Sequence, residues 1–513
     1  MRYWKQQAWL VGIVGLAVLT CSLGVRGLAQ QPKVNPGTEK RPRPTLLYFG
    51  VSACANCHTN PENYKDSPPL LCRCNETVIW KKEDKHKDAY TNLFKDRAQQ
   101  MVKILQIKDV GNEKSCVSCH GVYVADANLK HPSFKAEDGV SCVACHGPYK
   151  EWIDKHGGID REEWRKKPRQ EKEDVWGMTD LWDPAKRTKK CASCHIGNSD
   201  EGKVVTHAMY AAGHPPLPGV EVSTFSDAMP RHWQYLKEKK EAAQKLLDYK
   251  PDELERTKLV VIGGLVDLQE AMNLLATQAE AQTRAAEPEG RALDLAQLDC
   301  YACHHELKVP GWRQARGYSG TPGRPQFRQW PLALIKLGMH HAGQDNRMPE
   351  LEKKLSALRA AFDVQPFGKL DEVARAAHDL AKWCAQLEAG LGQKNIKYDR
   401  AGAVSLLRQL CSLSATDVPD YDTARQMAWA FKMIYSELAE LDPKPANDSE
   451  IQAKLKALDA ELKLSLPSGQ EHQLLAELPL ALQKISEYNP GKVQQIFQQL
   501  AKLLPPAADK SKP

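Results

Sequence analysis

Apolar residues recur every three or four positions through much of the second half of the chain. That spacing places them on one face of an α-helix and predicts helices that pack against one another. From residue 331 to 504 we predict a bundle of about six or seven helices. Three of the apolar stripes are Val373, Ala377, Leu380, Leu387 and Leu391; Ala424, Met427, Phe431, Ile434 and Leu438; and Ile451, Leu455, Leu458 and Leu462.

The first half has a different pattern. Residues 54–195 contain little apolar sequence from which a protein core could be built. Helices are expected over about 231–249 and from Pro251 to about Ala286, where a proline and two acids suit the first turn of a helix. Residues 308–331 are rich in Gly, Pro and Arg and predict irregular structure. The predicted fold class is therefore mainly α, with few strands.

The first 29 residues are typical of an export signal. Arg2 and Lys5 supply a basic start, the run from Ala8 to Val25 carries no charge, and Gly27-Leu28-Ala29 suits cleavage. A retained membrane anchor and a buried helix are the alternatives. No other stretch looks long and apolar enough to span a bilayer.

The charge balance argues against nucleic-acid binding. The formal charge of +7 falls to +4 when Arg2, Lys5 and Arg26 leave with the predicted signal. With 26% charged and 42% hydrophobic residues, the chain has the composition of ordinary globular protein.

Ten of the 15 cysteines form five copies of Cys-x-x-Cys-His, the attachment motif of c-type haem. Two cysteines three apart lie on one side of a helical turn, so both sulfurs can form thioethers with one porphyrin. The adjacent His then becomes the proximal iron ligand. The motif residues are Cys54, Cys57 and His58; Cys116, Cys119 and His120; Cys142, Cys145 and His146; Cys191, Cys194 and His195; and Cys300, Cys303 and His304.

The sequence thus predicts five haem c groups. Zinc sites and disulfides also use paired cysteines, but neither requires a His after every second Cys. Attachment of haem c takes place outside the cytoplasmic membrane, which agrees with an export signal. The predicted organisation is 1–29 signal or anchor, 30–47 flexible lead-in, 48–330 pentahaem cytochrome c domain, 331–504 helical bundle and 505–513 disordered tail.

Five cysteines lie outside the motifs. Cys21 is in the predicted signal. Cys384 and Cys411 fall on apolar helical stripes and are interpreted as core residues, with a mutual disulfide as the alternative. Cys72 and Cys74 flank one residue, and we interpret them as a disulfide or packing pair. A reactive thiol pair near a haem is the other interpretation.

The segment from Cys54 to His195 resembles the cytochrome c-554 family of multihaem electron carriers. The first motif is followed by His86-Lys87-Asp88-Ala89, and the third stands in Gly139-Val140-Ser141-Cys142-Val143-Ala144-Cys145-His146-Gly147-Pro148. The resemblance implies that His156 is the distal ligand opposite His58, and His86 the one opposite His146. It also implies a second haem without a distal ligand, a gap that His131 could fill.

The chain departs from that family in its fifth motif and its helical extension. We expect His207 and His214 to be further distal ligands, of the fourth and fifth haems. For the fifth haem His305, His340 and His341 are alternatives. His232, His378 and His472 are expected to be exposed or structural.

A His on both faces of an iron leaves no open site, which suits an electron carrier. We therefore predict periplasmic or exported electron transfer rather than enzymatic turnover. The alternative is an oxidoreductase acting on a nitrogen or sulfur compound at an open second haem. A third hypothesis gives the bundle a docking role in a membrane-associated respiratory complex. The predicted partners are redox proteins, not nucleic acids.

Overall fold

The computed structural model describes most of one compact unit, residues 44–513, taken by itself. The residues described are 44–65, 71–158, 160–284, 292–304, 307, 309, 311, 324–325, 327–364, 368–393, 395–415, 418–441, 443–462 and 487–506. The predicted signal with Cys21, most of the lead-in, and most of the tail lie outside these residues. So do His305, His472 and most of the segment predicted to be irregular.

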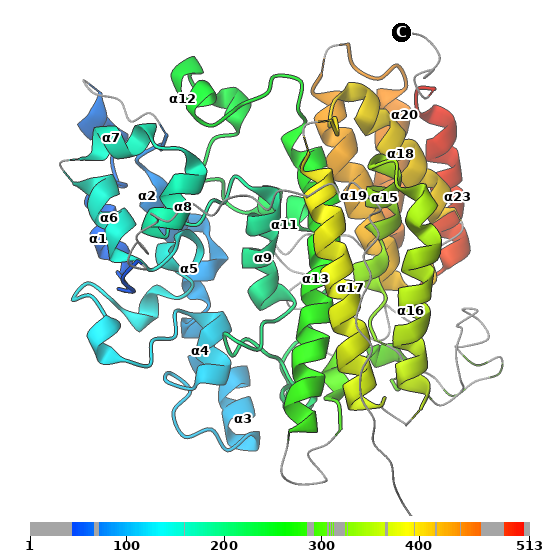
Figure 1. The fold of residues 1–513 in the computed structure, drawn as a ribbon, viewed down its shortest axis with the longest axis horizontal. Coiled ribbons are helices and arrows are strands. Elements are labelled where there is room, and N and C mark those ends of the chain that lie inside the picture. Colours follow the sequence, from blue (N-terminus) through cyan, green and yellow to red (C-terminus); the bar gives the residue numbers. More distant parts are fainter. Residues whose placement is uncertain are drawn as a thin grey trace, which may run out of the picture. The chain divides into compact units, whose positions relative to one another are not determined.

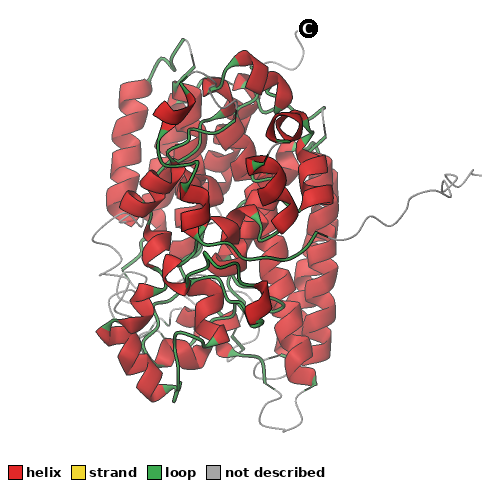
Figure 2. Ribbon diagram, turned by 90° about the vertical axis from the view of Figure 1, so that its left-hand side faces the viewer, coloured by secondary structure: helices red, strands yellow, loops and turns green. Residues whose placement is uncertain are grey.

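The described residues are helical, which confirms the mainly α fold class (Figure 2). In that part of the chain strand pairing is limited to isolated bridges, such as the one between Leu46 and Tyr149.

Short helices make up the part that carries the first four motifs (Figure 1). They are α1 (Val51–Ala55), α2 (Glu76–Glu83), α3 (Asp96–Ile104), α4 (Lys114–His120), α5 (Cys142–His146), α6 (Lys150–Gly157), α7 (Arg161–Lys166), α8 (Arg169–Trp176), α9 (Pro184–His195), α10 (His207–Ala211), α11 (Val222–Ala228) and α12 (Glu241–Leu246). Single 3₁₀ turns are η1 (Pro61–Tyr64), η2 (Lys85–Asp88), η3 (Thr91–Phe94), η4 (Ala127–Leu129), η5 (Ala136–Asp138), η6 (Leu236–Glu238), η8 (Leu295–Gln297), η9 (Cys300–Ala302), η10 (Trp330–Leu332) and η11 (Asp345–Arg347).

The apolar clusters in the region of the first four motifs are small. One consists of Tyr90, Leu93, Val110 and Val117 with a few partly buried neighbours. This agrees with the scarcity of apolar sequence there, because a core of this size cannot hold some 150 residues without another apolar component.

The helix predicted over 231–249 is wrong. Only η6 and α12 form there, because Lys239 and Lys240 are extended, with ψ of 157° and 150°. Lys239 is buried and its ammonium group donates to the carbonyl oxygen of Leu71 at 2.8 Å. That contact requires the chain to leave the helical path.

The longest helix is α13, Glu255–Thr283, which begins four residues after Pro251 and ends just short of the predicted Ala286. Among the described residues, α13 is the one helix that is long and apolar enough to cross a membrane. Of its most apolar 18-residue stretch, 78% is buried inside the protein. By length and composition this corrects the prediction that only the N-terminal run had spanning character. Burial of this kind is what a core helix of a globular protein shows.

Beyond residue 331 the described residues form seven helices, as the apolar stripes predicted. They are α15 (Ile335–His341), α16 (Met348–Asp363), α17 (Leu370–Leu391), α18 (Arg400–Ser414), α19 (Tyr421–Ala439), α20 (Asp448–Leu462) and α23 (Pro490–Leu503). All residues of the three predicted stripes are buried, and α13 lies along α17 (Figure 1). The apolar core is continuous from Ala185 to Leu504, and the domain boundary at 330 stays a prediction.

Cys384 and Cys411 are buried free thiols in this core. Their predicted role as core residues is confirmed, and the structure contains no disulfide between them.

Candidate haem sites

Each Cys-x-x-Cys-His motif forms a helical turn. The second motif lies in α4, the third is α5 itself, and the fourth ends α9. In the first and fifth motifs the His amide donates to the carbonyl oxygen of the first Cys, at 3.0 Å for His58 and 2.8 Å for His304. Both sulfurs of each motif therefore lie on one side of a turn, as thioether bonds to a single porphyrin require.

Four motif histidines face a second histidine from a distant part of the chain. The ring centres of His58 and His156 are 5.7 Å apart, and those of His120 and His214 are 6.2 Å apart. The other two pairs are His86 with His195 at 6.5 Å, and His207 with His304 at 6.4 Å.

These separations fit a metal ion held between two imidazoles. Because a metal–nitrogen bond is about 2.0 Å and the nitrogen lies about 1.2 Å from the ring centre, two imidazoles on opposite faces of one metal have centres roughly 6.4 Å apart. The rings are nearly parallel in two pairs, at 13° for His58–His156 and 27° for His207–His304. They are perpendicular, at 87°, in the other two.

Hydrogen bonds orient several of these rings by their Nδ1 atoms. His58 Nδ1 lies 2.7 Å from a carboxylate oxygen of Glu76, and His86 Nδ1 lies 2.9 Å from one of Asp84. His120 and His214 donate from Nδ1 to the carbonyl oxygens of Ala89 at 2.9 Å and Pro215 at 2.7 Å. Fixing Nδ1 leaves Nε2 as the free donor atom, the arrangement usual for metal-binding histidines.

His232 lies near His146 of the third motif. Burial lowers the pKa of His146 to about 4, and His232 is the neighbouring group that adds most to this lowering. The Nδ1 atom of His232 is buried without a hydrogen-bond partner in the protein. A neutral, buried imidazole is what metal binding requires, and the sequence prediction had given His232 no ligand role.

In two cases the neighbouring ring differs from the expected pairing. The resemblance implied His86 opposite His146, but the ring of His86 faces His195 instead. His214 was expected to serve the fourth or fifth haem, but it faces His120 of the second motif. His207 faces His304 of the fifth motif, and His156 faces His58 as implied.

The other histidines have different surroundings. His131, considered for the second motif, stacks on Phe49 with ring centres 4.2 Å apart and bonds to Ser133. His340 pairs with Asp345, His341 packs on Tyr398, and His378 bonds to Glu280. No signal in the sequence separated these residues from His214, because the ring that His214 faces, His120, comes from another segment of the chain.

Motif cysteines of different motifs lie side by side. The Cys54 thiol lies beside that of Cys142, and the Cys119 thiol beside that of Cys194. The attachment points of the first and third motifs, and of the second and fourth, are therefore adjacent. Among the described residues no three motif cysteines converge as zinc ligands would, and the one such group found is His58, Cys72 and Cys74.

Helical Cys-x-x-Cys-His turns with a second His opposite define the class of c-type cytochromes. Comparison with known families agrees: residues 53–147, which hold the first three motifs, match the family model of cytochrome c554 and c-prime. The resemblance to this family of c-type cytochromes is thereby confirmed over this segment. No significant match was found among curated proteins or solved structures.

Proposed function

We propose that the chain is an exported electron carrier with five haem c groups, each held by two histidines. The proximal ligands are His58, His120, His146, His195 and His304. Opposite them, in the same order, we assign His156, His214, His232, His86 and His207. The observation that carries the proposal is the spacing of four His pairs at the separation that one bridging metal ion gives.

A haem with two protein ligands accepts and releases one electron with little change at the iron. The protein residues hold the rings in place before and after that change. Glu76 and Asp84 fix two of the imidazoles through Nδ1, and Trp152 and Trp164 pack on His156 with ring centres 5.6 and 5.4 Å away. Rigidly held ligands keep the reorganisation energy of electron transfer small.

The proximity of the first four motifs to one another also supports a carrier. The first and third motifs meet at Cys54 and Cys142, and the second and fourth at Cys119 and Cys194. Cys145 of the third motif also lies near Cys194 of the fourth. Each of the first four sites therefore has a neighbour at its attachment point.

The alternative was an enzyme with an open second haem. His214 opposite His120 counts against it, because the face on which a substrate would bind holds a protein imidazole. The bundle adds packing against the fourth site, where Phe225 lies between His195 and Trp429 of α19.

Export and partners follow from the sequence. Covalent attachment of haem c takes place outside the cytoplasmic membrane, and the N-terminal segment has the features of a signal or an anchor. We infer redox proteins as partners, including a membrane-associated respiratory complex, with the helical bundle as the part available for docking.

Low-temperature EPR of the ferric protein tests the proposal, with haem content measured by intact mass. We expect five haems, all low-spin. The pairs with perpendicular rings should give strongly anisotropic signals, and the near-parallel pairs rhombic ones. A high-spin iron that shifts with added cyanide would contradict it.

Variants sharpen this test. His214→Ala should convert one haem to high spin, whereas the matched control His131→Ala, close to the same motif in sequence, should leave every signal unchanged. His232→Ala should open a different haem from His214→Ala. A fully low-spin spectrum in the His232→Ala protein would overturn that ligand assignment.

A further inference from the structure

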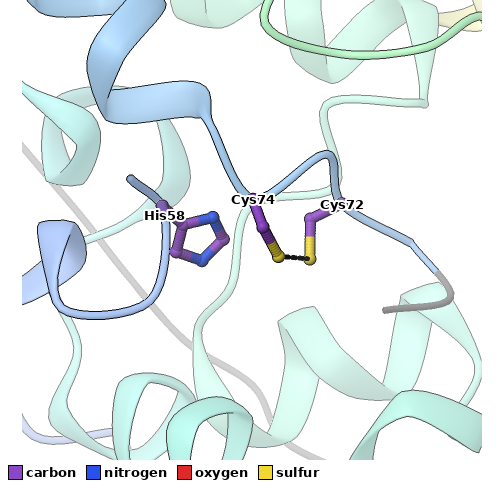
Figure 3. A group of neighbouring side chains, drawn as sticks. All are labelled: His58, Cys72 and Cys74. Carbon is purple, nitrogen blue, oxygen red and sulfur yellow. Dashed lines mark hydrogen bonds between the residues drawn. The ribbon is translucent and has the colours of Figure 1, made fainter. Parts of the chain in front are cut away.

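Cys72 and Cys74 form a thiol pair beside the first haem motif (Figure 3). Their sulfur atoms are 3.9 Å apart, within contact but not bonded. Both sulfurs lie within 4.8 Å of a ring nitrogen of His58 and of each other. No function of the motifs uses these two residues.

The backbone holds the two thiols together. Cys74 has a φ of 58°, a left-handed conformation that non-glycine residues rarely adopt. Arg73, the residue between the two cysteines, is held by two hydrogen bonds. Its amide donates to Glu76 at 2.5 Å, and its guanidinium donates to the carbonyl oxygen of Arg231 at 2.8 Å. Strained backbone of this kind persists where the surroundings over-determine it, which is frequent at functional sites.

A metal site is a poor explanation of the cluster. His58 Nδ1 is bonded to Glu76 at 2.7 Å, and the His58 ring lies beside that of His156, with ring centres 5.7 Å apart. Two sulfurs without a third or fourth ligand do not make a zinc site. The pair is better suited to redox chemistry of the sulfurs themselves.

We propose that Cys72 and Cys74 are a dithiol–disulfide couple that exchanges electrons with the first haem, an inference that rests on the proposed haem at His58. In the oxidising step the two thiols lose two protons and two electrons, a sulfur–sulfur bond forms, and two ferric haems become ferrous. The electrons leave one at a time through the first haem. The pair thus joins two-electron thiol chemistry to one-electron haem chemistry.

The dithiol is restored by an external dithiol, small or on a partner protein. Its thiolate attacks the disulfide, the bond between Cys72 and Cys74 breaks, a disulfide forms in the partner, and the two protons pass to the chain. Cys72 is half-buried and Cys74 only 2% exposed, so Cys72 is the sulfur that a partner can reach. A disulfide across one residue closes a short, strained ring, and strained disulfides are the labile ones.

The test is a redox titration of the full holoprotein. Samples are equilibrated with mediators at a series of potentials without oxygen and then quenched with an alkylating agent. After digestion, the mass of the peptide that contains Cys72 and Cys74 is measured by mass spectrometry. We expect a disulfide when the haems are ferric and two alkylated thiols when they are ferrous. The change should follow a two-electron couple, about 30 mV for each tenfold change in ratio.

Kinetics provide a second measurement. Dithiothreitol should reduce the haems of Cys72→Ser at least tenfold more slowly than those of the wild type, whereas ascorbate, which has no thiol, should reduce both alike. Cys384→Ala, which removes a buried bundle thiol, is the matched control and should behave as wild type.

Three results would overturn the proposal. The first is full alkylation of Cys72 and Cys74 at every potential. The second is protection of the two thiols from alkylation by a bound metal, detected in the native mass. The third is an equal rate of haem reduction by dithiothreitol in Cys72→Ser and wild type. Loss of haem from Cys54 and Cys57 in the intact mass would instead refute the proposed first haem, so the two failures are distinguishable.

Discussion

Replacing Glu76 by Gln should raise the reduction potential of the haem at His58. The Glu76 carboxylate lies 2.7 Å from His58 Nδ1, and both side chains are mostly buried, with 17% and 18% of their surface exposed. Burial alone would raise the pKa of Glu76, but the hydrogen bonds from His58 and Arg73 outweigh that effect. The net pKa of Glu76 is below its usual value, so the carboxyl group is ionised. A negative charge here favours the ferric state, which carries one more positive charge than the ferrous state.

The magnitude follows from the geometry. The 2.7 Å contact, about 2.2 Å across the imidazole and an iron–nitrogen bond of about 2.0 Å put the carboxylate roughly 7 Å from a metal at Nε2. At an effective dielectric constant of about 20, one unit charge at that distance is worth about 2.4 kcal/mol. For a one-electron couple this corresponds to about 100 mV. Gln keeps a hydrogen-bond acceptor but removes the charge.

The assay is a spectroelectrochemical titration followed by EPR, in which the His58–His156 haem is one of the two expected to give a rhombic signal. One midpoint potential should rise by about 100 mV, and the others by less than a third of that. Glu62→Gln, which removes an exposed carboxylate in η1, is the control and should change little. If no potential moves by more than the control, or if it falls, the electrostatic reasoning is refuted.

Three further predictions concern stability, measured by denaturant unfolding of the holoprotein. Glu437→Ala should lower the free energy of unfolding by about 3 kcal/mol, because it leaves three buried donors at the start of α13 unpaired. These donors are the amide of Arg256 and the amide and hydroxyl of Thr257. An effect as small as that of the surface variant Glu241→Ala would contradict this prediction. Gly264→Ala should be destabilising by about 1–3 kcal/mol, because its added Cβ would lie 2.5 Å from Leu334 Cβ, whereas Gly263→Ala, with its nearest neighbour at 3.4 Å, should be neutral or stabilising. Burial raises the pKa of Glu255 to about 7. Between about pH 4.5 and 7 this carboxyl is therefore ionised in the unfolded chain but protonated in the folded protein, so its contribution makes stability fall as pH rises. Glu255→Gln should remove about 3 kcal/mol of that fall, and parallel pH profiles of the two proteins would refute the prediction.

The sequence by itself determined the chemistry of the motifs and the helical class. Cys-x-x-Cys-His needs only one helical turn, so its geometry is local and can be read from five consecutive residues. The stripes of α17, α19 and α20 were predicted for the same reason, since a spacing of three or four decides which face is buried. The break at Lys239 was missed because its cause is a contact with Leu71, 168 residues away.

Only the tertiary structure decided which histidine faces which motif. His214 lies 94 residues from His120 and His207 lies 97 from His304, so no local pattern links the members of either pair. His232 had no signal at all, and His131, nearer to the second motif in sequence, turned out to stack on Phe49. A ligand pair depends on two segments meeting across a shared metal, and that meeting is a property of packing between segments rather than of any one of them.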